Sequence, residues 1–291
     1  MRLTVFTPTY NRRDLLIRAY RSLTRQTLKD FEWLIVDDGS TDATDDLVKE
    51  WMDEGLITIR YYYKENGGKM RAHNMGVSKA GAPLFLCLDS DDMLVDTAVF
   101  DLLSSYDTVK GEVIDGKRVG GIVAHKGRSK TELLSGVGFP KCDFSTLYGL
   151  YLKGFKGETT LMYETDILRQ FYFPEIDGEK YVPEDYVYDK IDNVCTLGVL
   201  DKIVTVCEIV EEGYTDSVKA LRRNNPKAWY LYYEQRSYIT PFSILKIKYL
   251  GRYVIYAKRS GKGLNDSKRI SAFYKLLGML YASLLIITRK E

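Results

Sequence analysis

Residues 84–92, Leu-Phe-Leu-Cys-Leu-Asp-Ser-Asp-Asp, constrain the fold more than any other stretch of the sequence. Five apolar residues in succession, followed at once by polar ones, are typical of a strand that is buried on both faces of a sheet. Three carboxylates, Asp89, Asp91 and Asp92, follow this strand. Carboxylates this close together repel one another, so a cation or hydrogen-bond donors are needed to stabilise the cluster. The alternative is that the aspartates begin a helix at Met93, since acidic residues stabilise the first turn of a helix.

Alternating strands and helices lead up to this stretch. We expect strands at residues 3–7, 31–36, 57–63 and 84–88, with a helix between each strand and the next, the third of them at residues 69–79. Pro8 should end the first strand, because proline cannot donate a hydrogen bond to a sheet. Asn11 should cap the first helix, and Thr41 or Asp42 the second. This order of elements predicts a mostly parallel sheet flanked by helices, an α/β fold.

A second acidic pair, Asp37 and Asp38, follows the second predicted strand. Parallel strands end at one edge of a sheet, so this pair should lie near Asp89, Asp91 and Asp92, and ligands of open α/β sheets bind along that edge. On its own the pair would be interpreted as a turn and a helix cap. The sequence has neither a glycine-rich dinucleotide fingerprint nor a phosphate-binding P-loop, which disfavours both kinds of site.

Charge is distributed unevenly although the net charge is only +2. Residues 219–291 hold 16 Lys and Arg against 3 Asp and Glu, and the rest of the chain holds 26 against 37. Apolar residues recur in this basic tail at spacings of three and four, as Phe273, Leu276, Leu280, Leu284 and Ile287. A basic amphipathic segment of this kind binds anionic membrane surfaces. The alternatives are a helical cap packed on the catalytic part and a contact in a homo-oligomer.

The cysteines and the apolar runs indicate where in the cell the protein is located. The four cysteines are widely spread without a Cys-x-x-Cys pair, as in proteins of a reducing compartment. No segment reaches the ~18 uncharged apolar residues of a membrane-spanning helix. We therefore expect a cytoplasmic protein, peripheral on the inner face of the cytoplasmic membrane, with no nucleic-acid partner.

Five short motifs occur in an order that resembles family 2 glycosyltransferases. They are Thr7-Pro8-Thr9-Tyr10-Asn11, Asp37-Asp38-Gly39-Ser40, Glu65-Asn66-Gly67-Gly68, Asp89-Ser90-Asp91-Asp92 and Glu184-Asp185. The resemblance implies the GT-A fold and a nucleotide-diphospho-sugar donor. It covers about residues 1–230, with a nucleotide-binding half at 1–110 and an acceptor-side half at 111–230. Residues 231–291 would form a helical C-terminal extension.

The resemblance also implies roles for individual residues. The base and ribose of the donor, expected to be a UDP-sugar, would lie on Pro8, Tyr10, Asp37 and Asp38. Further nucleotide-binding candidates are Asn66, Gly67, Lys69, Asp89 and Ser90, although Gly67 and Gly68 are better explained as a turn than as a phosphate-binding loop. Asp89-Ser90-Asp91 resembles the Asp-x-Asp motif, which makes Asp89, Asp91 and Asp92 the candidate ligands of Mg²⁺ or Mn²⁺.

Two more groups of residues are implied further along the chain. Asp185, preceded by Glu184, resembles the position of the general base. The segment around Thr215, Ser217 and Lys219 resembles one that closes over the donor diphosphate.

These implications and the residue chemistry predict an inverting glycosyltransferase of surface-polysaccharide synthesis. Its acceptor would be a saccharide or a lipid-linked saccharide. A divalent ion would offset the charge of the leaving diphosphate, and a carboxylate would take the proton of the acceptor hydroxyl. One alternative is a non-catalytic module that binds nucleotides or saccharides. The other is a sugar-1-phosphate nucleotidylyltransferase, which would need a basic, glycine-rich loop where the sequence has residues 7–11.

Overall fold

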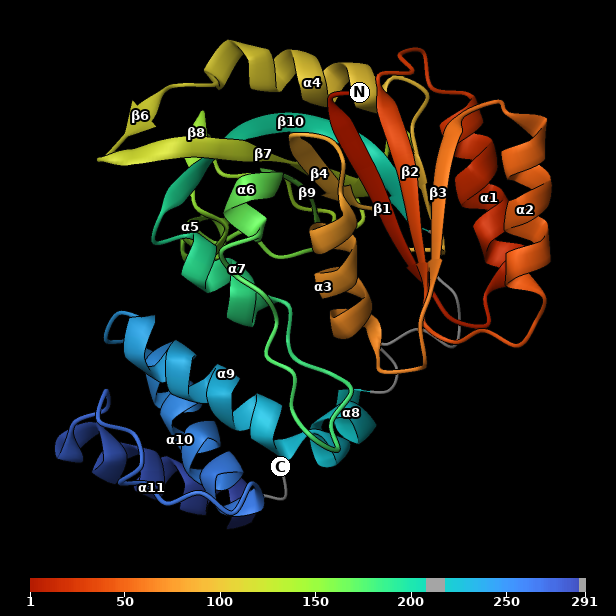
Figure 1. The fold of residues 1–291 in the computed structure, drawn as a ribbon. Helices are drawn as coiled ribbons and strands as arrows, with labels where there is room; N and C mark the ends of the chain where they lie inside the picture. Colours follow the sequence, from red (N-terminus) through yellow and green to blue (C-terminus); the bar gives the residue numbers. More distant parts are fainter. Residues whose placement is uncertain (208–217, 288–291) are drawn as a thin grey trace. The chain divides into compact units, whose positions relative to one another are not determined.

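A computed structural model describes residues 1–207 and 218–287 of the chain (Figure 1). They form two compact units. The first unit comprises residues 1–172 and 187–207, and the second comprises residues 173–186 and 218–287.

One mixed sheet forms the centre of the first unit, with the strand order β3-β2-β1-β4-β9-β7-β10-β5. Its parallel half consists of β1 (Leu3–Thr9), β2 (Phe31–Asp37), β3 (Thr58–Tyr63) and β4 (Leu84–Cys87). The other half consists of β5 (Asp92–Leu94), β7 (Lys117–Gly127), β9 (Thr159–Glu164) and β10 (Cys195–Cys207), with the two-residue strands β6 (Val113–Ile114) and β8 (Phe144–Ser145). Antiparallel β9 joins the halves by pairing with β4 and β7. The expected mostly parallel sheet flanked by helices is confirmed.

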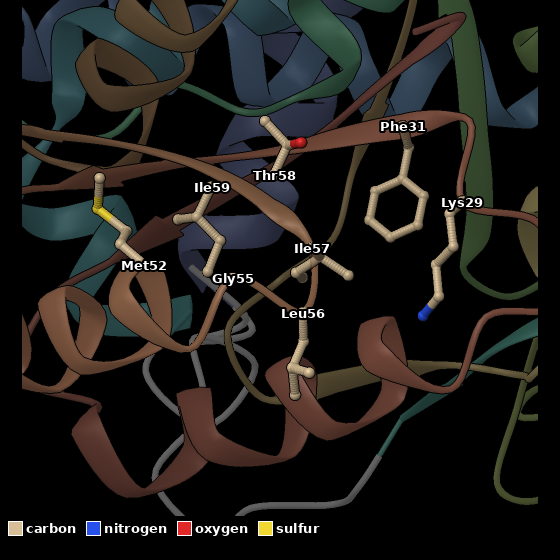
Figure 2. A pocket seen from close by; sticks show the side chains of 8 residues that line it. All are labelled: Lys29, Phe31, Met52, Gly55, Leu56, Ile57, Thr58 and Ile59. Atoms are coloured by element: carbon tan, nitrogen blue, oxygen red, sulfur yellow. The ribbon is translucent and has the colours of Figure 1, made fainter.

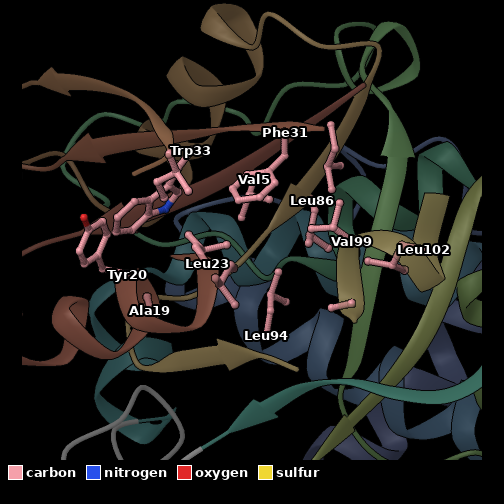
Figure 3. Packing of buried hydrophobic residues seen from close by; sticks show 14 of the residues in the cluster. Val5, Ala19, Tyr20, Leu23, Phe31, Trp33, Leu86, Leu94, Val99 and Leu102 are labelled. Atoms are coloured by element: carbon pink, nitrogen blue, oxygen red, sulfur yellow. The ribbon is translucent and has the colours of Figure 1, made fainter. Parts of the chain in front are cut away.

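Helices cover both faces of the sheet. The larger core lies between the sheet and helices α1 (Arg13–Thr24), α2 (Thr44–Glu54) and α4 (Ala98–Val109). Figure 3 shows Val5, Trp33 and Leu86 of the sheet beside Leu23 of α1 and Leu102 of α4. These side chains are buried, which accounts for the uninterrupted apolar runs of the strands.

Helix α3 (Lys69–Lys79) packs through an aromatic cluster that is separate from the larger core. The ring of Phe6 lies 5.7 Å from that of His73 on this helix and 5.3 Å from that of Phe85, measured between centroids. His73 is therefore a buried packing residue. The short helices α5 (Leu147–Leu152), α6 (Thr165–Leu168) and α7 (Asp185–Ile191) complete the elements of residues 1–207.

Two details of the first strand and helix differ from the sequence prediction. Strand β1 continues through Pro8, which pairs with Val36. Proline is tolerated there because its nitrogen faces the side of β4, whose pairing with β1 has already ended at Cys87. The prediction that Asn11 caps α1 was also wrong. Asn11 has a φ of 50°, and its side-chain oxygen accepts the backbone N–H of Thr41 at 2.7 Å.

The predicted cap of the second helix was wrong as well. Helix α2 begins at Thr44, and the Asp42 carboxylate accepts the backbone N–H of Arg13 at 2.9 Å and the hydroxyl of Thr44 at 2.6 Å. Asp42 therefore binds the first residue of α1 as well as that of α2, and it is not the N-cap residue of α2. As a result, the loops that follow β1 and β2 are tied to each other.

The second unit is helical, as expected for the C-terminal extension. It contains α8 (Val218–Asn224), α9 (Pro226–Ile239), α10 (Ile244–Arg259) and α11 (Ala272–Ile287) around an aromatic core that includes Trp229, Tyr233 and Tyr256. Residues 173–186 belong to it because Glu179 accepts the N–H groups of Lys227 and Ala228, both at 2.8 Å, at the start of α9. No helix within the two described ranges is long and apolar enough to cross a membrane.

Gly76 allows α3 to approach the sheet, and replacing it should destabilise the first unit. A Cβ atom at this position would lie 2.4 Å from the ring of Phe6. We expect Gly76→Val to lower the free energy of unfolding by about 1–3 kcal/mol, the usual cost of overpacking a core. The measurement is urea unfolding. Ser78→Val places the same side chain on an exposed position of α3 and should cost less than about 0.5 kcal/mol; equal losses would contradict this explanation.

Candidate active site

The carboxylate of Asp38 organises the loop between β3 and α3. Asp38 directly follows β2, and its side chain is almost fully buried. It accepts the backbone N–H groups of Gly67 at 2.9 Å and Gly68 at 2.7 Å, and it pairs with the Lys64 ammonium. The side chain of Asn66 donates to the same carboxylate at 3.2 Å. The two glycines thus form a turn whose N–H groups bind Asp38.

Asp37 is held in the same way by its neighbours. Its carboxylate accepts the backbone N–H of Ser40 and the hydroxyl of Tyr61, both at 2.7 Å. Burial and this hydrogen bond raise the pKa of Tyr61, so the phenol stays a donor. The predicted nucleotide-binding pair is therefore a rigid part of the sheet edge. Pro8 is buried at this edge, whereas the Tyr10 side chain is 47% exposed.

Each of the three carboxylates that follow β4 has a cation beside it. Lys69 lies 2.7 Å from Asp89, Arg12 lies 2.7 Å from Asp91, and Lys126 lies 2.8 Å from Asp92. These distances join the ammonium or guanidinium nitrogen to a carboxylate oxygen. The alternative that the aspartates begin a helix is wrong, because β5 starts at Asp92 and the next helix starts at Ala98. Ser90 is buried within the turn.

The loop before α3 connects the two acidic clusters. Its residues 64–68 bind Asp38, and Lys69, the first residue of α3, binds Asp89. Gly68 has a φ of 95°, a conformation that favours glycine, and it lets the chain turn from one carboxylate to the other. Both acidic clusters and the loops after β1 and β2 thus lie at the carboxyl edge of the parallel strands.

Lys126 gives the acidic cluster a buried counter-charge. Its ammonium nitrogen lies 2.8 Å from Asp92 and 3.8 Å from Asp89. Burial opposes the charge of Asp89, but Lys69 and Lys126 outweigh it and hold the pKa of Asp89 well below its usual range. Burial raises the pKa of Asp92, and the charge of Asp89 adds to this effect. The carboxylates in turn raise the pKa of Lys126 despite its burial, so it stays protonated.

The donor set fits a hard divalent ion that keeps part of its shell for phosphate and water. Carboxylate oxygens are the ligands that Mg²⁺ prefers, and one or two of them suffice when substrate phosphates supply the rest. Asp91 suits this role because it is partly exposed and Arg12 contacts one of its oxygens. Within the described ranges, no group of three or more His, Cys, Asp or Glu side chains is arranged to hold a metal ion.

The predicted general base belongs to the second unit. Asp185 is the first residue of α7, and its side chain is 43% exposed. Arg236 lies 2.9 Å from its carboxylate, and the hydroxyl of Tyr232 lies 3.5 Å from it. The desolvating surroundings raise the pKa of Asp185, and Arg236 opposes the rise. A raised pKa brings a carboxylate closer to the range in which it accepts a proton efficiently.

Four candidates remain, two within the described residues and two outside them. Glu184 directly precedes α7, and Lys219 is an exposed residue of α8. Thr215 and Ser217 lie outside the described residues.

Three site residues were missed from the sequence, namely Arg12, Lys64 and Lys126. β7 extends to Gly127 and places Lys126 on the strand. In the sequence, Lys126 lies two residues beyond the apolar run of residues 119–124, with His125 between them, whereas Asp37 and Asp89 directly follow their runs. Arg12 and Lys64 each lie within three residues of a strand end at the same edge.

A pocket of about 440 Å³ lies elsewhere on the first unit (Figure 2). It is lined by the end of α2 and the first residues of β2 and β3, with Met52, Phe31 and Ile59 among its walls. The amino ends of the parallel strands form the opposite edge of the sheet from the acidic residues. This pocket is therefore not part of the candidate active site.

The role of Lys126 can be tested by removing its charge at nearly constant length. We expect Lys126→Met to lower the free energy of unfolding by about 3 kcal/mol at neutral pH, because Asp89 and Asp92 lose their buried counter-charge. Lys130→Met is the control: Lys130 pairs with Asp96 at the surface and should contribute less than about 1 kcal/mol. Adding Asp92→Asn to Lys126→Met should restore part of the loss. Equal losses for the two single variants would refute the role.

Comparisons with known proteins agree with the geometry. The family described as Glycosyl transferase family 2 matches residues 4–167. A validoxylamine A glucosyltransferase of Streptomyces hygroscopicus is 45% identical over 108 residues, which cover 36% of this chain and 25% of the relative. A poly(ribitol-phosphate) beta-N-acetylglucosaminyltransferase of Staphylococcus aureus is 30% identical over 183 residues, which cover 62% of this chain and 51% of the relative. The chain thus spans at most about half the length of these relatives.

Solved structures show the same fold. Residues 1–349 of S. aureus TarS in complex with UDP-GlcNAc match with a TM-score of 0.63 at 20% identity, covering 96% of this chain and 78% of that chain. A mannosyltransferase from Pyrobaculum calidifontis, in complex with GDP-Man and Mn²⁺, matches with a TM-score of 0.58 at 16% identity, covering 98% and 80%. The predicted GT-A fold is confirmed. Because the family match extends over more than half of the chain, this protein belongs to glycosyl transferase family 2.

Proposed function

We propose that the protein transfers a sugar from a UDP-sugar to the hydroxyl of a saccharide or lipid-linked saccharide, with inversion, in the synthesis of a surface polysaccharide. The observation that carries this proposal is the carboxyl edge of the sheet. Two acidic clusters lie there beside four cations, and the loop at residues 64–69 connects the clusters. Family membership supports glycosyl transfer, and it favours neither the nucleotidylyltransferase nor the non-catalytic module.

The nucleotide would bind on the loops that follow β1, β2 and β3. Asp37 and Asp38 fix these loops through their hydrogen bonds, and Tyr10 and Asn66 would contribute contacts to base and ribose. Uridine is the favoured nucleoside because the similar TarS structure is a complex with UDP-GlcNAc. The relatives named for poly(ribitol-phosphate) and teichoic acid support a cell-wall polymer as the destination of the sugar.

Asp91, together with Asp89, would hold Mg²⁺ or Mn²⁺, whereas Asp92 is buried and remains paired with Lys126. When bound, the ion would offset the charge of the leaving diphosphate. The similar mannosyltransferase structure, a complex with GDP-Man and Mn²⁺, supports this assignment. Arg12 and Lys69 contact the same carboxylates and would orient the phosphate groups from the protein side. Thr215, Ser217 and Lys219 would close over the diphosphate.

Asp185 would take the proton of the acceptor hydroxyl as the new glycosidic bond forms. Arg236 and Tyr232 hold its carboxylate in place, and Glu184 precedes it in the chain. A base on the face opposite the leaving group gives a single displacement and therefore inversion at the anomeric carbon. We further propose that the protein acts at the inner face of the cytoplasmic membrane, where lipid-linked acceptors are accessible; the basic tail supports this location.

Asp91 should be required for the metal dependence of nucleotide binding. In wild-type protein we expect Mn²⁺ to increase the affinity for UDP by about tenfold or more, since the ion bridges carboxylate and diphosphate. Asp91→Ala should abolish this gain and leave metal-free binding in place, because Arg12 loses its partner and remains available to phosphate. Isothermal titration with and without Mn²⁺ measures both values. Asp14→Ala, at an exposed position of α1, is the control. A full Mn²⁺ gain in Asp91→Ala would exclude Asp91 as a ligand.

Asp185 should be required for turnover and dispensable for donor binding. We expect Asp185→Asn to reduce the transfer rate by about 10²–10⁴, the usual contribution of a general base. UDP affinity should stay at the wild-type value. A set of nucleotide sugars is first screened for transfer or hydrolysis by the wild type. The donor found in this way is then used to measure the transfer rate of each variant. Glu184→Gln, one position earlier, tests whether the effect is specific to Asp185. A variant that retained wild-type turnover would remove Asp185 from this role.

A further inference from the structure

Helix α11 has two apolar faces: one is packed against α10, and the other is exposed in the part of the chain that the structure describes. Gly278, Ala282 and Leu285 are buried against α10. A Cβ atom at Gly278 would lie 2.8 Å from the backbone oxygen of Leu250, and one at Gly251 would lie 2.6 Å from the ring of Tyr281. These small residues let the two helices approach closely (Figure 1). The contact of α11 with α10 is therefore made by the face that carries Gly278, Ala282 and Leu285.

The other face of α11 is exposed and also apolar. Its large residues are 41–79% exposed, namely Phe273, Leu276, Met279, Leu280, Leu284, Ile286 and Ile287. Their spacing places them on one side of the helix, and no charged residue is exposed among them between residues 272 and 287. A surface helix of a globular protein normally turns charged and polar residues outward. Exposed apolar patches of this kind mark binding surfaces.

The exposed surface extends beyond α11. Phe242 and Ile244, at the start of α10, are 67% and 74% exposed. The ring of Phe242 lies 6.3 Å from that of Tyr274 on α11. Lys246 fixes this end of the helix pair, because its ammonium group donates to the carbonyl of Thr240 at 2.8 Å and lies 4.8 Å from the centre of the Tyr274 ring. We call Phe242, Ile244 and the exposed apolar residues of α11 the outer face.

The charges around the outer face indicate what it binds. Residues 241–290 contain 11 Lys and Arg against one acidic residue, Asp266. Lys268 and Arg269 are exposed directly before α11, and Lys258, Arg259 and Lys262 are exposed in the segment that precedes them. A second copy of this chain would bring an equally basic surface to the contact and would be repelled. A surface of anionic lipids attracts these cations and accepts the apolar side chains.

We propose that the outer face inserts into the interfacial region of an anionic bilayer, with α11 lying along the membrane plane. Within the described residues the helix has 16 residues, fewer than the ~20 needed to cross the hydrocarbon core, which favours a position in the interface. Apolar side chains enter the acyl region while the flanking lysines and arginines contact lipid phosphates. This inference deepens the membrane location proposed above and rests on it.

The experiment compares full-length variants in vesicle co-sedimentation. Wild-type protein should bind vesicles that contain phosphatidylglycerol and should bind pure phosphatidylcholine vesicles far more weakly. Leu276→Glu with Leu280→Glu should reduce binding to the anionic vesicles by about tenfold or more, since two inserted leucines are lost. The control is Leu56→Glu with Val113→Glu, which adds the same charge at two exposed apolar positions of the first unit. It should bind almost as well as the wild type.

Two further variants separate the contribution of apolar insertion from that of charge attraction. Leu276→Gln with Leu280→Gln removes the apolar groups without adding charge and should reduce binding to both kinds of vesicle. Lys268→Gln with Arg269→Gln should reduce binding to the anionic vesicles alone, by about tenfold, and this loss should shrink at high salt. Circular dichroism and the affinity for UDP should be unchanged in every variant.

Several results would overturn the proposal. Equal vesicle binding by the Leu276→Glu, Leu280→Glu protein and its control would exclude insertion through α11. Absence of vesicle binding, together with a wild-type dimer that these substitutions dissociate in analytical ultracentrifugation, would identify the outer face as a contact between copies. Absence of UDP binding by the wild type would instead refute the proposed transfer reaction and leave the lipid result intact, so the two failures are distinguishable.

Discussion

The candidate active site depends on neutralising carboxylates that the fold forces together. Parallel strands bring Asp38, Asp89, Asp91 and Asp92 to one edge of the sheet. Cationic side chains and backbone N–H groups of the same chain neutralise these carboxylates. Gly67 and Gly68 donate to Asp38, while Lys126 supplies a buried charge to Asp92. A buried charge without a partner would cost several kcal/mol, so these contacts hold the edge together before any ligand arrives.

The ion pairs of Arg12 and Lys69 are suited to being replaced by contacts between these cations and the phosphates of a nucleotide diphosphate. Arg12 and Lys69 contact Asp91 and Asp89, which are 21% and 32% exposed, whereas Lys126 lies nearest to Asp92, which is only 7% exposed. Lys126 also lies 3.8 Å from Asp89 and 3.6 Å from Glu158, but its side chain is less exposed than those of Arg12 and Lys69. Lys126 is thus suited to a structural role, whereas Arg12 and Lys69 are suited to contact the diphosphate of the donor.

The two units divide the proposed work between them. The first unit carries the nucleotide side of the chemistry on a rigid sheet edge. The second unit carries Asp185, held by Arg236 and Tyr232, and the outer face of α11. Glu179 connects these functions, because it fixes the segment that leads to Asp185 onto the first turn of α9. The proposed base thus belongs to the same unit as the proposed membrane-binding surface, an arrangement suited to an acceptor carried by lipid.

The sequence alone determined the strand and helix order of the parallel half, since apolar runs and their polar ends are local signals. Residues 69–79 were predicted as a helix with the bounds that the structure shows, and the acidic residues were identified from their place after each strand. The caps were wrong because Asn11 and Asp42 bind backbone groups of other loops or helices, which local patterns do not reveal. Lys126 was missed because antiparallel pairing with β9, and pairing with β10, extends β7 beyond its apolar run.

The heptad-like spacing in α11 indicated an apolar stripe, but only tertiary packing decided that Gly278, Ala282 and Leu285 face α10 and that the stripe remains exposed. Periodicity defines the faces of a helix, whereas which face is buried depends on the shape of the neighbour that packs against it.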